Sequence, residues 1–104
     1  MDAEDEKLVT LARSARARTG ATEGAAVRDD MGRTYAAATV ALTTLSLSAV
    51  QAAVAAAVSS GVQKLEGAVV VTDSQTAADD DLRVLAELGV DVPIVADPSG
   101  TVRA

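Results

Sequence analysis

The chain has 104 residues, the size of one domain, and we expect a single domain over residues 1–104. It contains no Cys, His, Phe or Trp, and its net charge is −6. The missing Cys and His exclude disulfide bonds, catalysis by a thiol or an imidazole, and a conventional zinc site. The acidic charge and the single aromatic side chain, Tyr35, argue against the binding of nucleic acid.

The apolar residues are mostly small. The sequence has 23 Ala but only 9 Leu, so each buried apolar side chain removes little area from water. We therefore expect a thin core whose stability depends on close packing of the backbone or on a partner subunit. Tyr35 has the only large ring, and we assign it to the core or to an interface rather than to a ligand site.

The first predicted element is an amphipathic helix over residues 5–18. Its apolar face repeats at helical spacing, with Leu8, Leu11, Ala12 and Ala15. Acidic residues crowd the start of this helix and three arginines crowd its end, which suits the helix dipole: Arg13, Arg16 and Arg18. We interpret these arginines as a solvated helix end, with an anion or RNA patch as the alternative.

A β-hairpin is predicted next, with strands over residues 24–28 and 33–40. The turn between them contains Gly32, which can adopt the positive φ that tight turns require. The second strand contains three consecutive Ala residues, which do not favour a strand. Its assignment therefore depends on the turn and on the flanking Tyr, Thr and Val residues.

Residues 48–58 are predicted to form a buried helix. Ser48 and Gln51 have the spacing of a capping box, in which each side chain bonds the backbone amide of the other residue. The residues that follow are apolar almost all round, and such a helix must be covered on several sides. Residues 65–72 include a continuous apolar run, which is typical of a central strand buried on both faces.

The last third of the chain is predicted to hold a helix over residues 76–88, a short strand over 92–96 and an edge strand over 101–103. The apolar face of this helix has three leucines: Leu82, Leu85 and Leu88. The complete order is α-β-β-α-β-α-β-β. This order predicts an α/β fold, with a mixed sheet and helices on both faces.

We recognise no targeting segment in the sequence. The first residues are acidic where a signal peptide would be basic, and the longest apolar stretch, residues 45–58, is too short to span a bilayer. We therefore expect a cytoplasmic protein that does not contact a membrane.

Several segments between about residues 7 and 103 resemble the cytidine deaminase family. The family's helix motif C-A-E-R-A-A is similar to Ser48-Ala49-Val50-Gln51-Ala52-Ala53. Its V-L-A-E-L-G motif is matched literally by Val84-Leu85-Ala86-Glu87-Leu88-Gly89. The resemblance implies the three-layer sandwich of that family, in which a mixed sheet lies between helices.

The residues that carry the family's chemistry are replaced in this sequence. The resemblance implies a zinc ion held by Cys or His ligands, together with a Glu that moves protons without binding the metal. Ser48 stands at the position of the first zinc ligand, and Val50 stands at the position of the Glu. The two Cys of the family correspond to Ala78 and Asp81. The motif that grips the ribose falls on Thr39 and Ala41. The resemblance thus implies a degenerate member without a catalytic residue, metal ligand or cofactor.

Two polar features have both a functional and a structural interpretation. Asp79, Asp80 and Asp81 offer three carboxylates to a cation such as Mg²⁺. However, consecutive helical residues point in different directions, and Thr76 with Asp79 has the spacing of a capping box. Ser48 at a helix start resembles a nucleophile, but no base is available to activate it, and Ser is a common N-cap. We favour the structural interpretation of both features.

Two classes of function remain. The first is a catalytically inactive protein that serves as a binding or assembly module and forms a homo-oligomer, a dimer or a tetramer, through the Ala-rich helix 48–58. The alternative is a zinc-independent protein or enzyme that binds a nucleoside or another small ligand in the residual deaminase cleft. The missing Cys, His and aromatic residues favour the first class.

Overall fold

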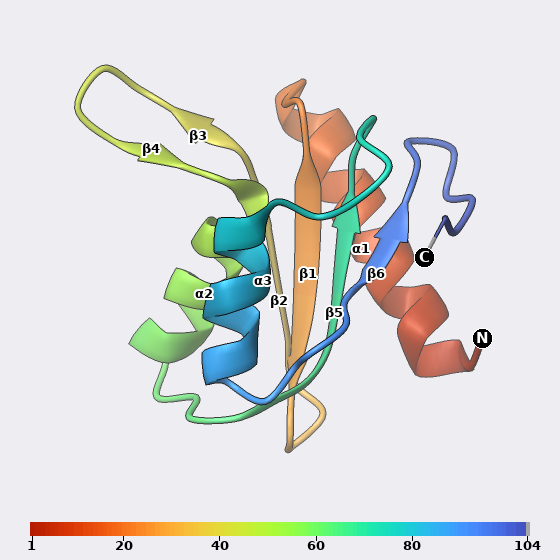
Figure 1. The fold of residues 1–104 in the computed structure, drawn as a ribbon, viewed down its shortest axis with the longest axis vertical. Coiled ribbons are helices and arrows are strands. Elements are labelled where there is room, and N and C mark those ends of the chain that lie inside the picture. The colour runs from red at the N-terminus through yellow and green to blue at the C-terminus, as the bar shows by residue number, and fades with distance from the viewer. Residues whose placement is uncertain (104) are drawn as a thin grey trace.

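A computed structural model describes residues 1–103, and within this range the chain forms three helices and six strands (Figure 1). In chain order they are α1 (Ala3–Thr19), β1 (Gly24–Asp29), β2 (Thr34–Ala38), β3 (Val40–Ala41), β4 (Ser46–Leu47), α2 (Ala49–Ser59), β5 (Leu65–Val71), α3 (Asp79–Glu87) and β6 (Ile94–Ala96).

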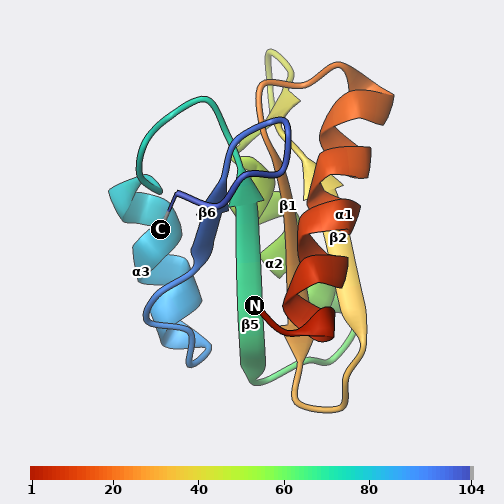
Figure 2. The same ribbon diagram turned by 90° about the vertical axis from the view of Figure 1, so that its right-hand side faces the viewer.

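Four strands form a central sheet in the order β2-β1-β5-β6. Strand β1 is antiparallel to both β2 and β5, whereas β5 and β6 are parallel. Helix α1 covers one face of this sheet, and α2 and α3 cover the other (Figure 2). The predicted mixed sheet with helices on both faces is therefore confirmed.

The core consists of one thin apolar layer on each side of the sheet. Because side chains alternate along a strand, β1 and β5 supply residues to both layers. The layer under α2 and α3 includes Val27 and Val70, and the layer under α1 includes Val69 and Val71. Residues 68–71 of β5 are all buried, which confirms the prediction of a central strand.

Close contact between backbones compensates for the small side chains. Gly24 begins β1 directly beneath α1. A Cβ atom at Gly24 would lie 2.0 Å from the carbonyl oxygen of Ala12 and 2.9 Å from the Cβ of Arg16. The absence of a side chain at this position thus allows the helix to rest on the strand.

Two predictions for the last third of the chain are wrong. Helix α3 begins at Asp79 rather than at residue 76, and its N-cap, Ala78, makes no side-chain cap bond. Thr76 lies in the preceding loop, so it forms no capping box. Residues 101–103 form a single bridge between Val102 and Ala96 instead of a strand, because the chain has only just left the turn that begins at Asp97.

A small hairpin formed by β3 and β4 is absent from the predicted elements. The predicted strand 33–40 is interrupted at Thr39, whose side chain bonds the backbone of Glu23. The chain then turns through Leu42 and Leu45, where the amide of Leu42 donates to the carbonyl of Leu45 at 2.8 Å. This hairpin projects from the body of the molecule (Figure 1).

Helix α2 packs against the sheet and against α3, but one side of it is uncovered within a single chain. Five of its residues are buried against the sheet: Ala49, Val50, Ala53, Val54 and Ala57. The other side of the helix exposes Ala55, Ala56 and Val58. The sheet and α3 thus cover this apolar helix on two sides, and the expected cover on the side of Ala55, Ala56 and Val58 is missing in one chain. None of the helices in residues 1–103 has the length and apolar character needed to cross a membrane.

The turn between β1 and β2 is organised by a buried carboxylate. Asp29 is fully buried and accepts hydrogen bonds at 2.9 Å from the backbone amides of Met31 and Arg33 and from Nε of Arg33. Burial raises the pKa of Asp29, but the hydrogen bonds from the Arg33 and Met31 amides and from the Arg33 side chain outweigh burial. The pKa is thereby held below its ordinary value of 3.8.

We expect Asp29 to make the protein sensitive to acid. Because its pKa is lower in the folded chain, ionised Asp29 contributes stability above the unfolded pKa of 3.8, and this contribution disappears as the pH falls through the folded pKa. In urea unfolding between pH 7 and pH 2.5, the stability difference between wild type and Asp29→Asn should be constant above about pH 5 and shrink below pH 4. A difference that stays the same down to pH 2.5 would contradict this role.

Candidate functional site

Helices α2 and α3 begin at the same end of the molecule, the end at which the parallel strands β5 and β6 stop (Figure 1). Ser48 is the N-cap of α2. Its Oγ accepts a hydrogen bond from the Gln51 amide at 3.0 Å, and Oε1 of Gln51 accepts one from the Ser48 amide at 2.9 Å. The capping box predicted for this helix is confirmed.

The same hydroxyl joins the two helices. Oγ of Ser48 donates a hydrogen bond to Oδ1 of Asp81 at 2.5 Å, across 33 positions of sequence. Asp81 lies in the first turn of α3 and is only 3% exposed. Ser48 and Asp81 are two of the four positions at which the family resemblance places the catalytic residues, and the structure connects them directly.

The other two positions carry hydrocarbon side chains. Val50, in the first turn of α2, is 1% exposed and belongs to the core under this helix. Ala78 is the exposed N-cap residue of α3. Neither side chain can bind a metal ion or transfer a proton, so the polar groups at these four positions are limited to a hydroxyl and a carboxyl group.

The three consecutive aspartates point to different surroundings. Asp79 and Asp80 are exposed, and Asp80 forms an exposed ion pair with Arg83 at 3.4 Å, whereas Asp81 faces inward to Ser48. Within residues 1–103, no group of three or more His, Cys, Asp or Glu side chains is arranged to hold a metal ion. All three acids lie in the first turn of α3, where they complement the helix dipole.

The geometry of the Ser48–Asp81 contact does not fit a zinc ion. Two oxygen ligands lie about 2.0 Å from Zn²⁺ and, at a tetrahedral angle, roughly 3.3 Å from each other. The Ser48 and Asp81 oxygens are 2.5 Å apart, which is the separation of a short hydrogen bond. Since Ala78 offers no donor atom and a hydroxyl is not among the usual zinc ligands, the donor set at the ligand positions does not fit a zinc ion.

A polar network joins the residue before β1 to the residue after β5. Thr72, which follows β5, donates a hydrogen bond to Glu23 at 2.7 Å, and Nη1 of Arg103 donates to the Thr72 carbonyl at 2.9 Å. Thr39, the predicted ribose-grip position, bonds the Glu23 backbone, whereas Ala41 lies in the exposed hairpin. The residues of this polar network lie far apart in sequence and share no motif, so no local pattern in the sequence indicates the network.

The fold and the site together define a three-layer α/β protein in which a side-chain hydrogen bond joins two helix N-termini at the end of the sheet. A family model described as cytidine deaminase-like matches residues 1–100, and the chain belongs to this family. A search of curated proteins finds no match.

Solved structures show the same fold. The chain is similar to cytidine deaminase from Burkholderia pseudomallei, with 21% identity and a TM-score of 0.79 over 99% of this chain and 91% of that one. It is also similar to cytidine deaminase from Mycobacterium leprae, with 22% identity and a TM-score of 0.73 over 99% of this chain and 96% of that one. These similarities confirm the predicted cytidine deaminase-like sandwich.

Proposed function

We propose that the protein is a catalytically inactive member of its family that acts in the cytoplasm as an assembly or binding module. The Ser48–Asp81 hydrogen bond carries this proposal, because it engages the only two polar side chains at the degenerate positions with each other. Deamination of cytidine requires an activated water and a group that moves protons. The buried methyl groups of Val50 offer no such group at the position of the family's Glu.

The inactivity is tested by assaying the untagged protein for loss of the cytidine absorbance, with the Burkholderia pseudomallei cytidine deaminase as the positive control. We expect no turnover of cytidine or deoxycytidine above the blank, with or without added zinc. Turnover that scales with protein concentration would contradict the proposal. A rise in Tm with cytidine but without turnover would instead support the alternative of a zinc-independent nucleoside-binding protein.

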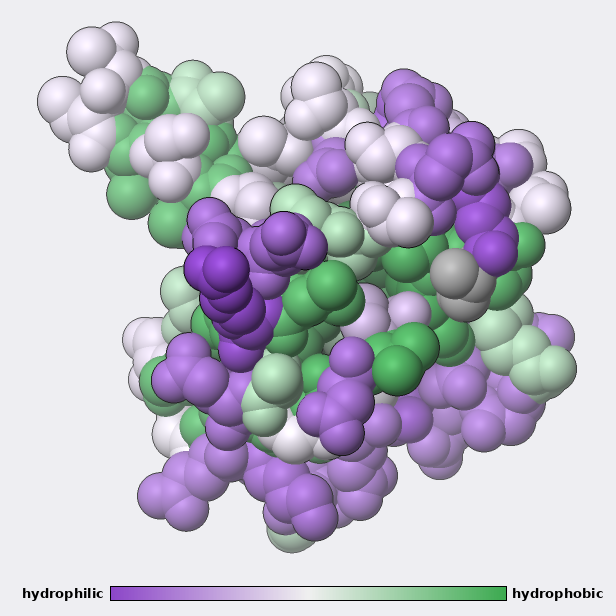
Figure 3. Space-filling model, viewed as in Figure 1, coloured by the Kyte–Doolittle hydropathy of each residue, from purple (hydrophilic) through white to green (hydrophobic). Residues whose placement is uncertain are grey.

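The assembly role is supported by two apolar surfaces that one chain leaves uncovered. The first is the outer face of α2, where Val58 is 49% exposed beside Ala55 and Ala56. The second is the β3–β4 hairpin, where Leu42 and Leu45 are 64% and 49% exposed. Figure 3 shows the hairpin standing clear of the body with apolar residues at its surface.

These surfaces fit a second copy of the chain. Residues 39–47 contain no charged side chain, and a two-stranded hairpin alone is marginally stable in water. Small residues on α2 allow another helix to approach closely. Burying both surfaces in a homo-oligomer would supply the apolar area that the thin core lacks.

We expect light scattering to give the mass of two or four chains at tens of micromolar. Ala56→Glu should reduce the mass to that of one chain, because it places an unpaired charge in the contact. Ala86→Glu, at an exposed site on α3, is the matched control and should leave the mass unchanged. Ala53 is fully buried within one chain, so a Glu there would damage the core instead. A wild-type mass of a single chain would refute the assembly.

A further inference from the structure

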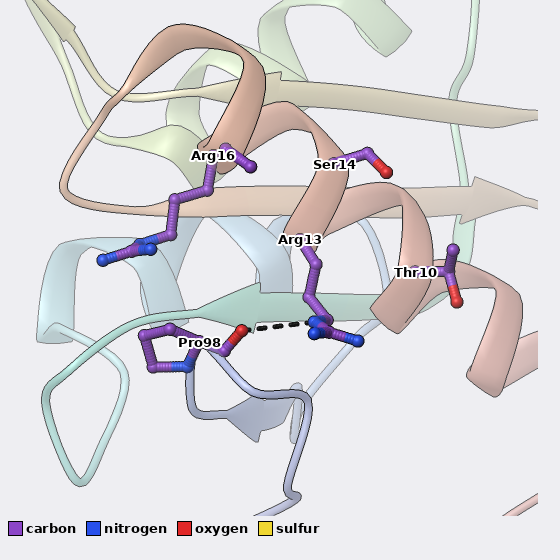
Figure 4. Close-up of a pocket in the computed structure, with 6 residues that line it drawn as sticks. Thr10, Arg13, Ser14, Arg16 and Pro98 are labelled. Carbon is purple, nitrogen blue, oxygen red and sulfur yellow. Dashed lines mark hydrogen bonds between the residues drawn. The ribbon is translucent and has the colours of Figure 1, made fainter.

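A surface cavity of about 250 Å³ lies between α1 and the turn that follows β6 (Figure 4). Its lining is formed by Thr10, Arg13, Ser14, Arg16, Ala17 and Pro98. Figure 4 shows the side chains of Arg13 and Arg16 extending from the helix on either side of Pro98. This cavity lies on the α1 face of the sheet, so it is separate from the Ser48–Asp81 contact on the other face.

Both guanidinium groups are anchored in a way that leaves their outer nitrogens available. Nε of Arg13 donates to the carbonyl of Pro98 at 3.2 Å, and Nε of Arg16 donates to the carbonyl of Thr22 at 3.2 Å. A guanidinium has five N–H donors, so four remain on the terminal nitrogens of each side chain. Anchoring through Nε orders the side chains before a ligand arrives, which reduces the entropy lost on binding.

The turn after β6 is shaped to accommodate Arg13. Gly100 has a φ of +94°, and a Cβ at this position would lie 3.2 Å from both Cδ and Nη1 of Arg13. The carboxylate of Asp97 in the same turn is already engaged, because it accepts hydrogen bonds from Ser99 and Thr101 at 2.6–3.0 Å. These bonds hold the carboxylate within the turn, and the turn contacts Arg13 through the Pro98 carbonyl.

Two arginines line this cavity, although the chain as a whole carries −6. Arg16 forms an ion pair with Asp73. Oδ2 of Asp73 lies 3.9 Å from Nη2 of Arg16, and the Asp73 side chain is 82% exposed. An ion pair so long and so exposed contributes little. The carbonyls at the end of α1 oppose an anion, but those of Arg16 and Ala17 already accept the Gly20 amide.

We propose that this cavity binds the phosphate group of a small phosphate monoester. Two guanidiniums anchored through Nε supply positive charge and the paired N–H donors that phosphate oxygens accept. The sequence alone favours a solvated helix end for these arginines. The hydrogen bonds that anchor Arg13 and Arg16, together with the cavity, favour an anion site instead. Arg18 is exposed and lies outside the cavity.

The proposal is tested by calorimetric titration of ribose 5-phosphate and of inorganic phosphate into the wild-type protein, with adenosine as a ligand without phosphate. Backbone amide NMR signals locate the site. We expect both phosphates to bind and to shift the signals of Ser14, Arg16 and Gly100, and adenosine to do neither. Arg13→Gln and Arg16→Gln should each weaken binding at least about tenfold. Arg83→Gln makes the same change of charge on α3 and should leave binding unchanged.

Three results would overturn the proposal. The first is the absence of heat and of signal shifts at 10 mM of either phosphate. The second is an equal effect of sodium chloride at matched ionic strength, which would show general screening. The third is binding that both Gln variants retain, or that Arg83→Gln weakens as much as they do. Circular dichroism of the variants separates lost binding from lost folding, and Arg13→Lys tests whether charge without the guanidinium shape is sufficient.

Discussion

Replacing Gly24 with Ala is expected to lower the free energy of unfolding by about 3 kcal/mol or more. The added Cβ would lie 2.0 Å from the carbonyl oxygen of Ala12, a contact that folded proteins do not tolerate. The obstructing atom belongs to the backbone of α1, so no rotation of a side chain relieves the clash. The helix must move away from β1, and the thin core beneath it must open.

Gly67→Ala is the matched control for this experiment. Gly67 lies on β5, and a Cβ there would meet the end of the Arg28 side chain at 2.8 Å, a side-chain group rather than backbone. We expect the free energy of unfolding of this variant to fall by about 1 kcal/mol or less. Ala lowers the conformational entropy of the unfolded chain, which offsets part of the loss. Urea unfolding followed by circular dichroism measures both variants. Equal stabilities of Gly24→Ala and wild type would show that α1 does not lie this close to β1.

The second large effect is expected from the contact between α2 and α3. Ser48→Ala removes the N-cap of α2 and leaves the carboxyl of Asp81 buried without its donor. Together these two losses should lower the free energy of unfolding by about 2–4 kcal/mol. Asp81→Ala leaves Ser48 free to cap α2, so its loss should be smaller. Ser60→Ala, at the exposed end of α2, is the control and should change stability by less than about 0.5 kcal/mol.

A double-mutant cycle isolates the Ser48–Asp81 interaction itself. If the two side chains are bonded directly, the double variant should lose less than the sum of the two single losses, by about 1–2 kcal/mol. Urea unfolding of the four proteins at pH 7 provides the four stabilities. Losses that add to within about 0.5 kcal/mol would mean that the hydroxyl and the carboxyl do not interact.

The parts of the fold that follow from local patterns could be predicted from the sequence. The apolar run in β5 predicts a strand that is buried on both faces, and the spacing of Ser48 and Gln51 predicts the start of a helix. The start of α3 could not be predicted in the same way. Thr76 and Asp79 have the spacing of a capping box, but the chain is still extended at Ala78, so the N-cap lies two residues later than the pattern indicates.

The functional features depend on contacts between distant residues. Nothing around Ser48 indicates that its hydroxyl meets a carboxyl 33 positions away, although the resemblance marked both residues. The β3–β4 hairpin has strands of two residues each and a turn without Gly or Asn, so it gives no hairpin signal. Arg13 and Arg16 become a pair of ordered donors only because Pro98 and Thr22 supply carbonyls from other segments.

We propose that the Ser48–Asp81 hydrogen bond takes the place of the family's metal site at the N-termini of α2 and α3. The most direct test of this proposal is a crystal structure from crystals grown with zinc chloride and cytidine, with data collected at the zinc absorption edge. We predict that Ser48 Oγ and Asp81 Oδ1 stay within hydrogen-bonding distance and that no anomalous peak appears between them. A zinc peak within about 2.2 Å of both oxygens would contradict the account.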